Sequence, residues 1–343
     1  MENRKDDQEP FPSSGQPCYS GGPVEEEQVM SEVHLGCSPY NSGTHLSRFS
    51  IYLPPRKVLR DCNTCTYNHI SRPETLNLDA DGDLILTRRR KAQKYHTVIT
   101  IHHNITSSLP RVGLQIWRAE LLLSDFVLHT ISTSSIFDGI VAVELGAGTG
   151  MAGMILAHVA RTVFLTDHGE EVLDNCARNV QNNAGIFHPN AQIHVRELDW
   201  KGPWPPKVAE YLQSVKRNVW TQTEIEELKK ASILLAADVI YSDDLTDAFF
   251  SILERLMAEN PEKVLYLALE KRYNFTLDDL DVVANGYSHF RSYLEGESNE
   301  LVSSPYSRCF LGKQINLKEI PKYVREYDRG DNVEIWEIKY KHH

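Results

Sequence analysis

The chain of 343 residues carries 47 Asp and Glu against 36 Lys and Arg, a formal net charge of -11, which argues against a nucleic-acid-binding surface built from clustered basic residues. It has no apolar run near the ~20 residues that span a bilayer and no signal-peptide core in its acidic opening residues, so we expect a soluble intracellular protein without membrane association. Its six scattered cysteines fit a reducing compartment better than a disulfide framework.

Two regions precede the main body of the chain. Residues 1–47 are rich in Pro, Gly, Ser and Glu and lack apolar periodicity, which predicts a disordered acidic tail. Residues 48–108 are expected to form an N-terminal extension of short strands and loops. One strand is predicted between Arg48 and Leu59, and another between His96 and Ile105, where polar and apolar residues alternate.

Two short motifs in this extension bear on binding and localisation. Cys62 and Cys65 form a single CxxC pair near His69, but no second pair follows at zinc-finger spacing, so ordinary thiols are favoured and no metal is predicted. The dense basic run from Arg88 to Lys94 is typical of a nuclear-import signal, with a solvated strand end as the alternative. We therefore expect the nucleus as the location, and the cytoplasm otherwise.

Residues 109–343 have the apolar density of a globular domain. Apolar side chains from Trp117 to Val127 recur at helical spacing. Strands and helices then alternate, which predicts an α/β fold with a mostly parallel sheet and helices on both faces. Strands are predicted at Val141–Glu144, Arg161–Asp167, Gln192–Trp200, Ile233–Tyr241, Lys263–Arg272, Ser307–Ile315 and Val333–Tyr340, and the intervening helices at Met151–Val159, Gly169–Asn183, Asp244–Asn260 and Thr276–Leu294.

The run Val141-Ala-Val-Glu-Leu-Gly-Ala-Gly-Thr-Gly150 has the pattern of a buried strand, a tight turn and a helix start. Glycines let the backbone turn sharply and let a ligand lie against the main chain. Acids also stand at the carboxyl ends of successive predicted strands, where α/β sheets bind ligands. One such acid is commonly a helix cap or turn residue. Four in register favour a ligand site: Glu144, Asp167, Asp199 and Asp238.

Two cofactor classes compete for this site. Gly148 to Gly153 matches GxGxxG, and Asp167 could bind a ribose, which would indicate a dinucleotide. However, the carboxylate of Glu144 would repel a pyrophosphate and attract the amino group of a methionine moiety. The residues therefore favour S-adenosyl-L-methionine, which carries no phosphate. A P-loop is excluded because no Gly-Lys-Ser/Thr run is present.

Four motifs, Val143–Gly150, Leu165–Asp167, Leu198–Trp200 and Asp238–Tyr241, resemble the successive motifs of the seven-β-strand methyltransferases. Within that class the chain resembles family 16, the protein lysine methyltransferases marked by Asp/Glu-x-x-Tyr/Phe. The resemblance covers roughly Leu109 to the C-terminus. It implies a seven-stranded Rossmann-like, mostly parallel sheet with an antiparallel C-terminal strand pair. Further matches lie at Gln115–Trp117, Asp243–Ala248, Glu270–Leu277 and Ser288–Arg291.

The resemblance also implies roles for individual residues. Asp238 and Tyr241 are expected at the mouth of the active site as the catalytic pair, where Asp238 holds the incoming amine and Tyr241 orients its lone pair. Asp167 is expected to accept from the ribose hydroxyls and Asp199 from the adenine amino group. The full set implied to bind the cofactor is Trp117, Glu144, Gly146, Gly148, Gly150, Asp167, Asp199, Trp200 and Ala237.

The expected reaction is methyl transfer from S-adenosyl-L-methionine to the ε-amine of a lysine in a protein substrate. The alternatives are another acceptor, namely protein histidine, RNA or a small molecule, or a Rossmann dinucleotide-binding protein. Asp238-Val-Ile-Tyr241 favours a lysine-directed methyltransferase over an amide-directed one, which typically carries Asn/Asp-Pro-Pro-Tyr/Phe at this position. The expected partners are a basic or nucleic-acid-associated protein substrate and, as in related family members, a chaperone, without direct nucleic-acid binding.

Overall fold

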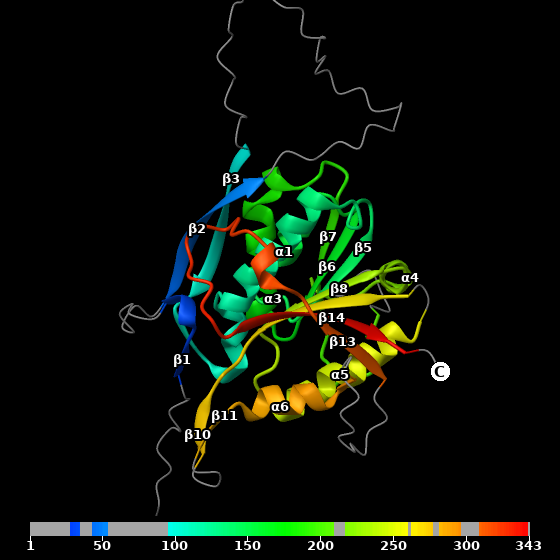
Figure 1. Cartoon of the computed structure of the whole chain (residues 1–343). Helices are drawn as coiled ribbons and strands as arrows, with labels where there is room; N and C mark the ends of the chain where they lie inside the picture. Colours follow the sequence, from blue (N-terminus) through cyan, green and yellow to red (C-terminus); the bar gives the residue numbers. More distant parts are fainter. Residues whose placement is uncertain are drawn as a thin grey trace, which may run out of the picture.

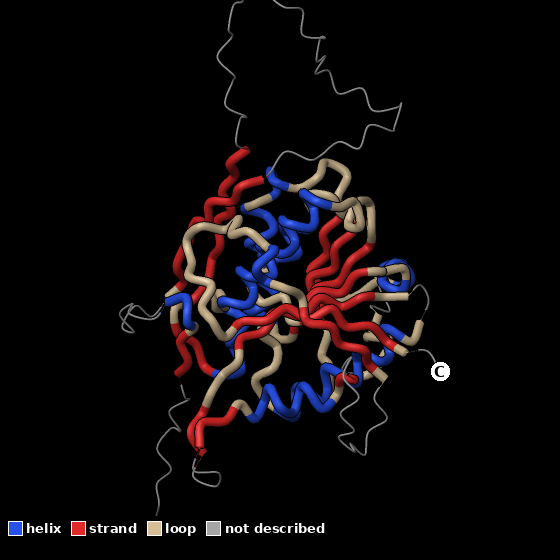
Figure 2. Tube along the Cα trace, in the orientation of Figure 1, coloured by secondary structure: helices blue, strands red, loops and turns tan. Residues whose placement is uncertain are grey.

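An eight-stranded mixed sheet lies at the centre of the computed structural model, which describes residues 28–34, 43–53, 95–208, 217–259, 262–276, 281–295 and 309–341. The strand order is β12-β13-β14-β9-β8-β5-β6-β7 (Figures 1 and 2). This confirms the predicted α/β fold with an antiparallel C-terminal pair. The strands are β5 (Val141–Leu145), β6 (Thr162–Asp167), β7 (Gln192–Glu197), β8 (Ile233–Ala237), β9 (Val264–Glu270), β12 (Leu294–Glu295), β13 (Phe310–Gln314) and β14 (Val333–Tyr340).

The order of the strands reverses at β5. β5 pairs in parallel with β6 on one side and with β8 on the other, so that Val143 lies opposite both Phe164 and Leu234. β7 and β9 extend the two sides in parallel, while β14 and β13 add antiparallel strands. Because successive crossovers diverge at β5, a crevice opens beyond its carboxyl end, where such folds bind ligands.

Helices cover both faces of the sheet, as Figure 1 shows. Alternate strand residues face opposite sides, so Ala142 joins one apolar cluster while Val141 and Val143 join the other. A strand buried on both faces reads as a continuous apolar run, which is why β5 is recognisable in the sequence. One face carries α1 (Arg118–Thr133), α2 (Met151–Leu156) and α3 (Glu170–Asn182), and the other carries α4 (Gln222–Lys229), α5 (Asp243–Met257) and α6 (Asn285–Ser292).

The N-terminal extension packs against the first of these faces. β2 (Thr44–Leu53) pairs antiparallel with β3 (Tyr95–Asn104), and Phe49 and Ile51 of β2 share the apolar cluster of α1. Asn179 of α3 and its C-cap residue Asn183 bind the backbone of β3: Thr100 N–H donates to Asn183 Oδ1 at 2.9 Å, and His102 N–H donates to Asn179 Oδ1 at 2.7 Å. These bonds pair backbone groups of β3 that the two-stranded pairing leaves free.

A second short pair joins the extension to the domain. β1 (Gln28–Met30) runs antiparallel to β4 (Thr106–Ser108), and the 3₁₀ turns η1 (Glu32–His34) and η2 (Leu109–Leu114) follow them. Two further 3₁₀ turns are η3 (Ala184–Ile186) and η4 (Leu317–Glu319). None of the helices in the described ranges is long and apolar enough to cross a membrane.

Four predictions need correction. Residues 28–34 and 43–47, assigned to the disordered tail, form β1, η1 and the start of β2, because partners distant in the chain supply the burial that their composition lacks. The helix predicted over 276–294 is replaced by the antiparallel pair β10 (Asn274–Thr276) and β11 (Asp281–Val283), followed by the shorter α6. No helix is predicted between Trp200 and Ile233, yet α4 lies there, and its start is fixed by a capping box between Thr221 and Glu224.

The strand count is the fourth correction. The sheet has eight strands instead of seven, because the two-residue strand β12 pairs with β13 at the edge. The Cys62–Cys65 pair and the basic run Arg88–Lys94 lie outside the described residues. Within those that are described, no group of three or more His, Cys, Asp or Glu is placed to hold a metal.

Candidate active site

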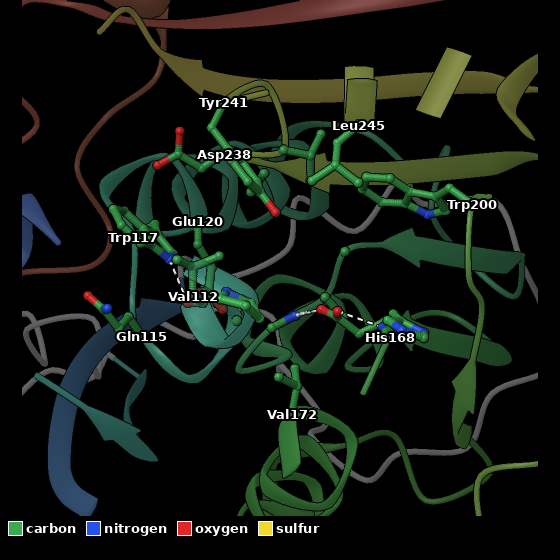
Figure 3. Close-up of a pocket in the computed structure, with 18 of the residues that line it drawn as sticks. Val112, Gln115, Trp117, Glu120, His168, Val172, Trp200, Asp238, Tyr241 and Leu245 are labelled. Atoms are coloured by element: carbon green, nitrogen blue, oxygen red, sulfur yellow. Dashed lines mark hydrogen bonds between the residues drawn. The ribbon is translucent and has the colours of Figure 1, made fainter. Parts of the chain in front are cut away.

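A cavity of about 510 Å³ lies beyond the carboxyl ends of β5, β6 and β8. This volume is within the usual range for small-molecule sites. Every predicted site residue except Gly150 lines it. Figure 3 shows Asp238 and Tyr241 on one side of the cavity and Val172 on the opposite side. The strand-end acids therefore meet at one edge of the sheet as the sequence predicted.

The glycine turn forms the floor of the cavity. Gly146 and Gly148 have φ values of 67° and 51°, in the left-handed region that favours glycine. A Cβ at Gly148 would lie 3.1 Å from the carbonyl oxygen of Gly113, and one at Gly146 would lie 2.8 Å from Val239. Gly150 has a different part in the turn: it begins α2 and packs on Cys176, which would lie 2.8 Å from an added Cβ. Gly150 does not line the cavity, but its φ of 82° is also in the left-handed region, and its lack of a side chain lets the start of α2 lie close to its neighbours.

Asp167 ends β6 and is fixed by the backbone. Its Oδ2 accepts from Gly148 N–H at 2.7 Å, and its Oδ1 accepts from His168 N–H at 2.7 Å. Burial raises the pKa of this carboxyl, while the two N–H donors oppose the rise. Each carboxylate oxygen has two lone-pair sites, so both oxygens can accept a further bond from a ligand hydroxyl.

Asp199 and Trp200 follow β7 at the other side of the cavity. Asp199 is exposed, and its Oδ1 accepts from Lys201 N–H at 2.9 Å. The Trp200 ring packs edge-on against Phe249, with 5.2 Å between centroids. Its Nε1 is buried and makes no hydrogen bond to any residue in the described ranges. A buried donor of this kind is costly unless a ligand or water accepts from it.

Two buried carboxylates stand behind the glycine turn. Glu144 is 1% exposed, and its Oε2 accepts from Gly153 N–H at 2.9 Å. Glu120 of α1 lies nearby, where its Oε1 accepts from Thr149 Oγ1 at 2.5 Å and from Met151 N–H at 3.0 Å. Burial raises the pKa of Glu120 to about 7 and that of Glu144 well above its ordinary value, and the Glu120 charge adds to the latter effect.

Sequence reasoning missed Glu120. The available signal was an acid inside the apolar run from Ala119 to Leu123, because a buried Glu must be paired or hydrogen-bonded. The position of Glu120 near Glu144 also affects the ionisation of Glu144. The two carboxyls destabilise each other's charged forms, so a cation placed beside them would favour their ionisation.

Asp238 follows β8 in an unusual backbone conformation. Its φ of 56° is the only positive value for a non-glycine residue in the described part of the chain. Asp tolerates this left-handed region better than most residues. The turn directs the carboxylate of this buried residue toward Arg272, whose Nη2 lies 2.6 Å from Asp238 Oδ2. Burial raises the pKa of Asp238 to about 6, although Arg272 opposes the rise.

Arg272 is the second residue that the sequence reasoning missed. It pairs with Asp238 and also with Glu32 of η1. Its guanidinium lies over the Trp117 ring, 4.8 Å from the centroid, and Trp117 Nε1 donates to the carbonyl of Val112 at 2.9 Å. Asp238 therefore has one oxygen, Oδ2, already bound by a cation, which nothing in the sequence indicated.

Tyr241 stands at the rim of the cavity and is 41% exposed. Burial of its ring, together with the charges of Asp167 and Asp238, raises the pKa of the phenol to about 12, so it keeps its proton at neutral pH. Gln115, in contrast, turns its amide away from the cavity centre (Figure 3). Its Oε1 accepts from Ser31 N–H at 2.7 Å, and its Nε2 donates to the carbonyl of Val29 at 2.9 Å.

The charge of the cavity is one-sided. The residues that line it include five acids and no Lys or Arg. The carboxylates here would repel a pyrophosphate, whereas a cationic ligand without phosphate would be attracted. The five are Glu120, Glu144, Asp167, Asp199 and Asp238.

Comparison with known proteins gives a consistent set of relatives. A family model described as lysine methyltransferase matches residues 93–282. Methyltransferase-like protein 22 of Homo sapiens is 42% identical over 249 residues, which cover 71% of this chain and 58% of the human protein. The Mus musculus protein of the same name is 32% identical over 317 residues, which cover 79% and 75%. Protein-lysine N-methyltransferase EFM3 of Chaetomium thermophilum is 24% identical over 188 residues, covering 54% and 51%. The matched region thus spans less than two thirds of the human relative.

Proposed function

Because the chain belongs to the lysine methyltransferase family, we propose that it transfers a methyl group from S-adenosyl-L-methionine to the ε-amine of a lysine in a protein substrate. The observation that carries this proposal is the cavity itself, in which five acids, Asp238 among them, and no Lys or Arg surround a glycine turn beside Tyr241. A relative named as a protein-lysine N-methyltransferase supports the same acceptor.

The residues of the cavity fit this cofactor. The glycine turn lets a ligand lie against the backbone, and Asp167 has free lone pairs for ribose hydroxyls. Asp199 and Trp200 lie where an adenine would contact an acceptor and an apolar wall, and the unpaired Trp200 Nε1 offers a donor. Glu144 and Glu120 favour a positive group near the turn. The bound cofactor would supply a methyl group activated by a sulfonium.

The protein then has to align the amine and remove water. A lysine amine has a reference pKa of about 10.4 and must lose its proton before it attacks. Desolvation between Trp117 and Tyr241 lowers the pKa of that amine. Asp238 Oδ1 can accept from an amine N–H, since Arg272 holds only Oδ2. Tyr241 keeps its proton, so its oxygen can accept a second N–H and orient the lone pair.

Incubation of the purified chain with radiolabelled S-adenosyl-L-methionine and cell lysate tests the proposal. We expect label that survives nuclease, is lost with protease, and appears as methyl-lysine after acid hydrolysis. Label on RNA, or methyl-histidine in the hydrolysate, would contradict the lysine assignment while retaining the cofactor. Failure to bind the cofactor in an equilibrium binding assay would contradict the whole proposal.

We also propose a nuclear location on the basis of the basic run Arg88–Lys94. A fluorescent fusion of the full chain should accumulate in the nucleus, and replacement of the basic residues in this run by Ala should disperse it. Equal distribution of both proteins would leave the cytoplasm as the location.

A further inference from the structure

The segment Gln28–His34 is fastened beside the active site by groups far from it in sequence. β1 pairs with β4 through the partners Val29 and Ser107. The fully buried Gln115 amide accepts from Ser31 N–H at 2.7 Å and donates to the Val29 carbonyl at 2.9 Å. His34 stacks on His103 at 4.6 Å between ring centroids. The backbone on both sides of Glu32 is therefore held in place.

Glu32 in turn contacts the Arg272 guanidinium, 240 residues away in the chain. Arg272 Nη1 pairs with Glu32 Oε1, and its other amino nitrogen, Nη2, pairs with Asp238 Oδ2 at 2.6 Å. The side chains of Glu32, Asp238 and Arg272 are 19%, 2% and 32% exposed, so solvent screens the two carboxylates weakly and the guanidinium in part. The cluster carries two negative charges and one positive charge.

The role of Glu32 follows from this charge count. Without Glu32, Asp238 and Arg272 would form a neutral pair, and the guanidinium would repel an incoming ammonium group. With it, the cluster keeps one net negative charge. We propose that Glu32 is a positioning residue of the amine site, which holds Arg272 in place against Asp238 and preserves the negative charge that attracts the target lysine. This inference rests on the proposed methyl transfer.

A purely structural role makes a different prediction. Glu32 Oε2 is buried and makes no hydrogen bond to the described residues, so a single oxygen forms the contact with Arg272. Gln at position 32 keeps an acceptor oxygen for Arg272 and nearly the same shape, removes the charge, and places an amide NH2 where the unpaired Oε2 lies. The variant Glu32→Gln therefore separates the electrostatic role from the structural one.

The charged and titratable groups that face Asp238 come from four parts of the fold. They are Glu32 of η1, Glu120 of α1, Glu270 and Arg272 at the end of β9, and Tyr241 after β8. Burial raises the pKa of Asp238, Arg272 lowers it and Glu32 raises it. Loss of the Glu32 charge leaves Arg272 uncompensated, so the pKa of Asp238 should fall in Glu32→Gln.

The experiment compares the full-length wild type, Glu32→Gln and a matched control, Glu319→Gln, in the exposed 3₁₀ turn η4. We expect Glu32→Gln to raise KM for the protein substrate about tenfold, as for loss of one weakly screened charge, with kcat within about twofold. The acid limb of kcat/KM should move to lower pH. Cofactor Kd, Tm and all values for Glu319→Gln should stay at those of the wild type.

Unchanged KM and pH profile in an active Glu32→Gln enzyme would overturn the inference. A large loss of Tm or of cofactor affinity would overturn it as well, because Glu32 would then be a structural residue. Carbon-13 NMR titration of the Asp238 carboxyl provides a readout without catalysis, and its pKa should fall in Glu32→Gln. An unshifted pKa refutes the inference, whereas a wild type that transfers no methyl group refutes the proposed function.

Discussion

The type of side chain at position 238 affects both the local backbone conformation and the proposed methyl transfer. The left-handed φ of 56° at Asp238 costs more for Ala than for Asn or Asp. Asp238→Asn therefore removes the charge with the least change in backbone, and we expect it to lower kcat/KM at least about 100-fold, in the range typical of one lost transition-state contact. Cofactor Kd should change less than about threefold.

Radiolabel transfer at saturating cofactor, with calorimetric titration of cofactor binding, measures both quantities. The exposed Asp174→Asn in α3 is the matched control. Full activity of Asp238→Asn would refute its role in holding the amine.

The raised pKa of Glu120 leads to a prediction of how the stability of the protein depends on pH. Burial raises the pKa of this carboxyl from 4.5 to about 7, so the folded state holds this proton more tightly than the unfolded chain. The stability that the protonated form contributes is full below pH 4.5 and is lost as pH rises through about 7. Gln keeps an acceptor for Thr149 and Met151 but does not titrate. As pH rises over this range, the difference in unfolding free energy between Glu120→Gln and the wild type should therefore shift in favour of the variant, by on the order of 3 kcal/mol at most.

Urea unfolding of the cofactor-free proteins at several pH values gives this difference. The exposed Glu226→Gln in α4 should show no such trend. A difference between Glu120→Gln and wild type that does not vary with pH would mean that Glu120 titrates normally.

At the scale of elements, α2 is pressed against the sheet beneath the glycine turn. A Cβ at Gly153 would lie 2.3 Å from Leu165 Cδ2 and 2.6 Å from Glu144 Oε2. Ala in a helix normally gains about 1 kcal/mol over Gly. Here we expect Gly153→Ala to lose about 1–3 kcal/mol instead, because overpacking outweighs propensity.

The control is Gly286→Ala in α6, where an added Cβ meets nothing within 4 Å. Thermal unfolding should show a lower Tm for Gly153→Ala and an equal or higher Tm for Gly286→Ala. Equal behaviour of the two variants would show that α2 can move away from β6 without cost.

At the scale of the whole molecule, the fully buried Asp125 of α1 joins the loop between β13 and β14 to the body of the fold. Its Oδ1 accepts from Tyr323 N–H at 2.7 Å and Val324 N–H at 2.8 Å, and its Oδ2 accepts from Tyr327 Oη at 2.5 Å and Arg329 Nη2 at 2.6 Å. The same loop meets the N-terminal extension, since Ser50 N–H donates to Glu326 Oε2 and Ile51 bridges to Val324. The Asp125 carboxylate thus holds the loop that in turn contacts β2.

Asp125→Asn should lower the unfolding free energy by about 3–5 kcal/mol, because it removes a fully buried carboxylate and leaves the partly buried Arg329 charge without its partner. Hydrogen exchange should also increase together in residues 317–330 and in β2, as these segments share the anchor. Denaturant unfolding and exchange mass spectrometry measure the two effects. A loss below about 1 kcal/mol, or faster exchange in only one segment, would contradict this coupling.

The sequence alone determined the sheet, the glycine turn and the acids at the strand ends. Parallel strands buried on both faces leave continuous apolar runs, and the carboxyl ends of such strands must meet at one edge. The sequence therefore predicted that Glu144, Asp167 and Asp238 lie together, and all three line the cavity. The sequence pattern predicted secondary structure less well at 276–294, where a short strand pair replaces part of the expected helix.

Only the tertiary structure decided what surrounds these acids. Glu120 contacts Met151 from 31 residues away, and Glu32 contacts Arg272 across 240 residues. Periodicity describes which face of an element is buried but not which distant side chain it meets, because that pairing depends on how whole elements dock. The site residues followed from the chain, whereas the charge balance that sets their pKa values followed from the fold.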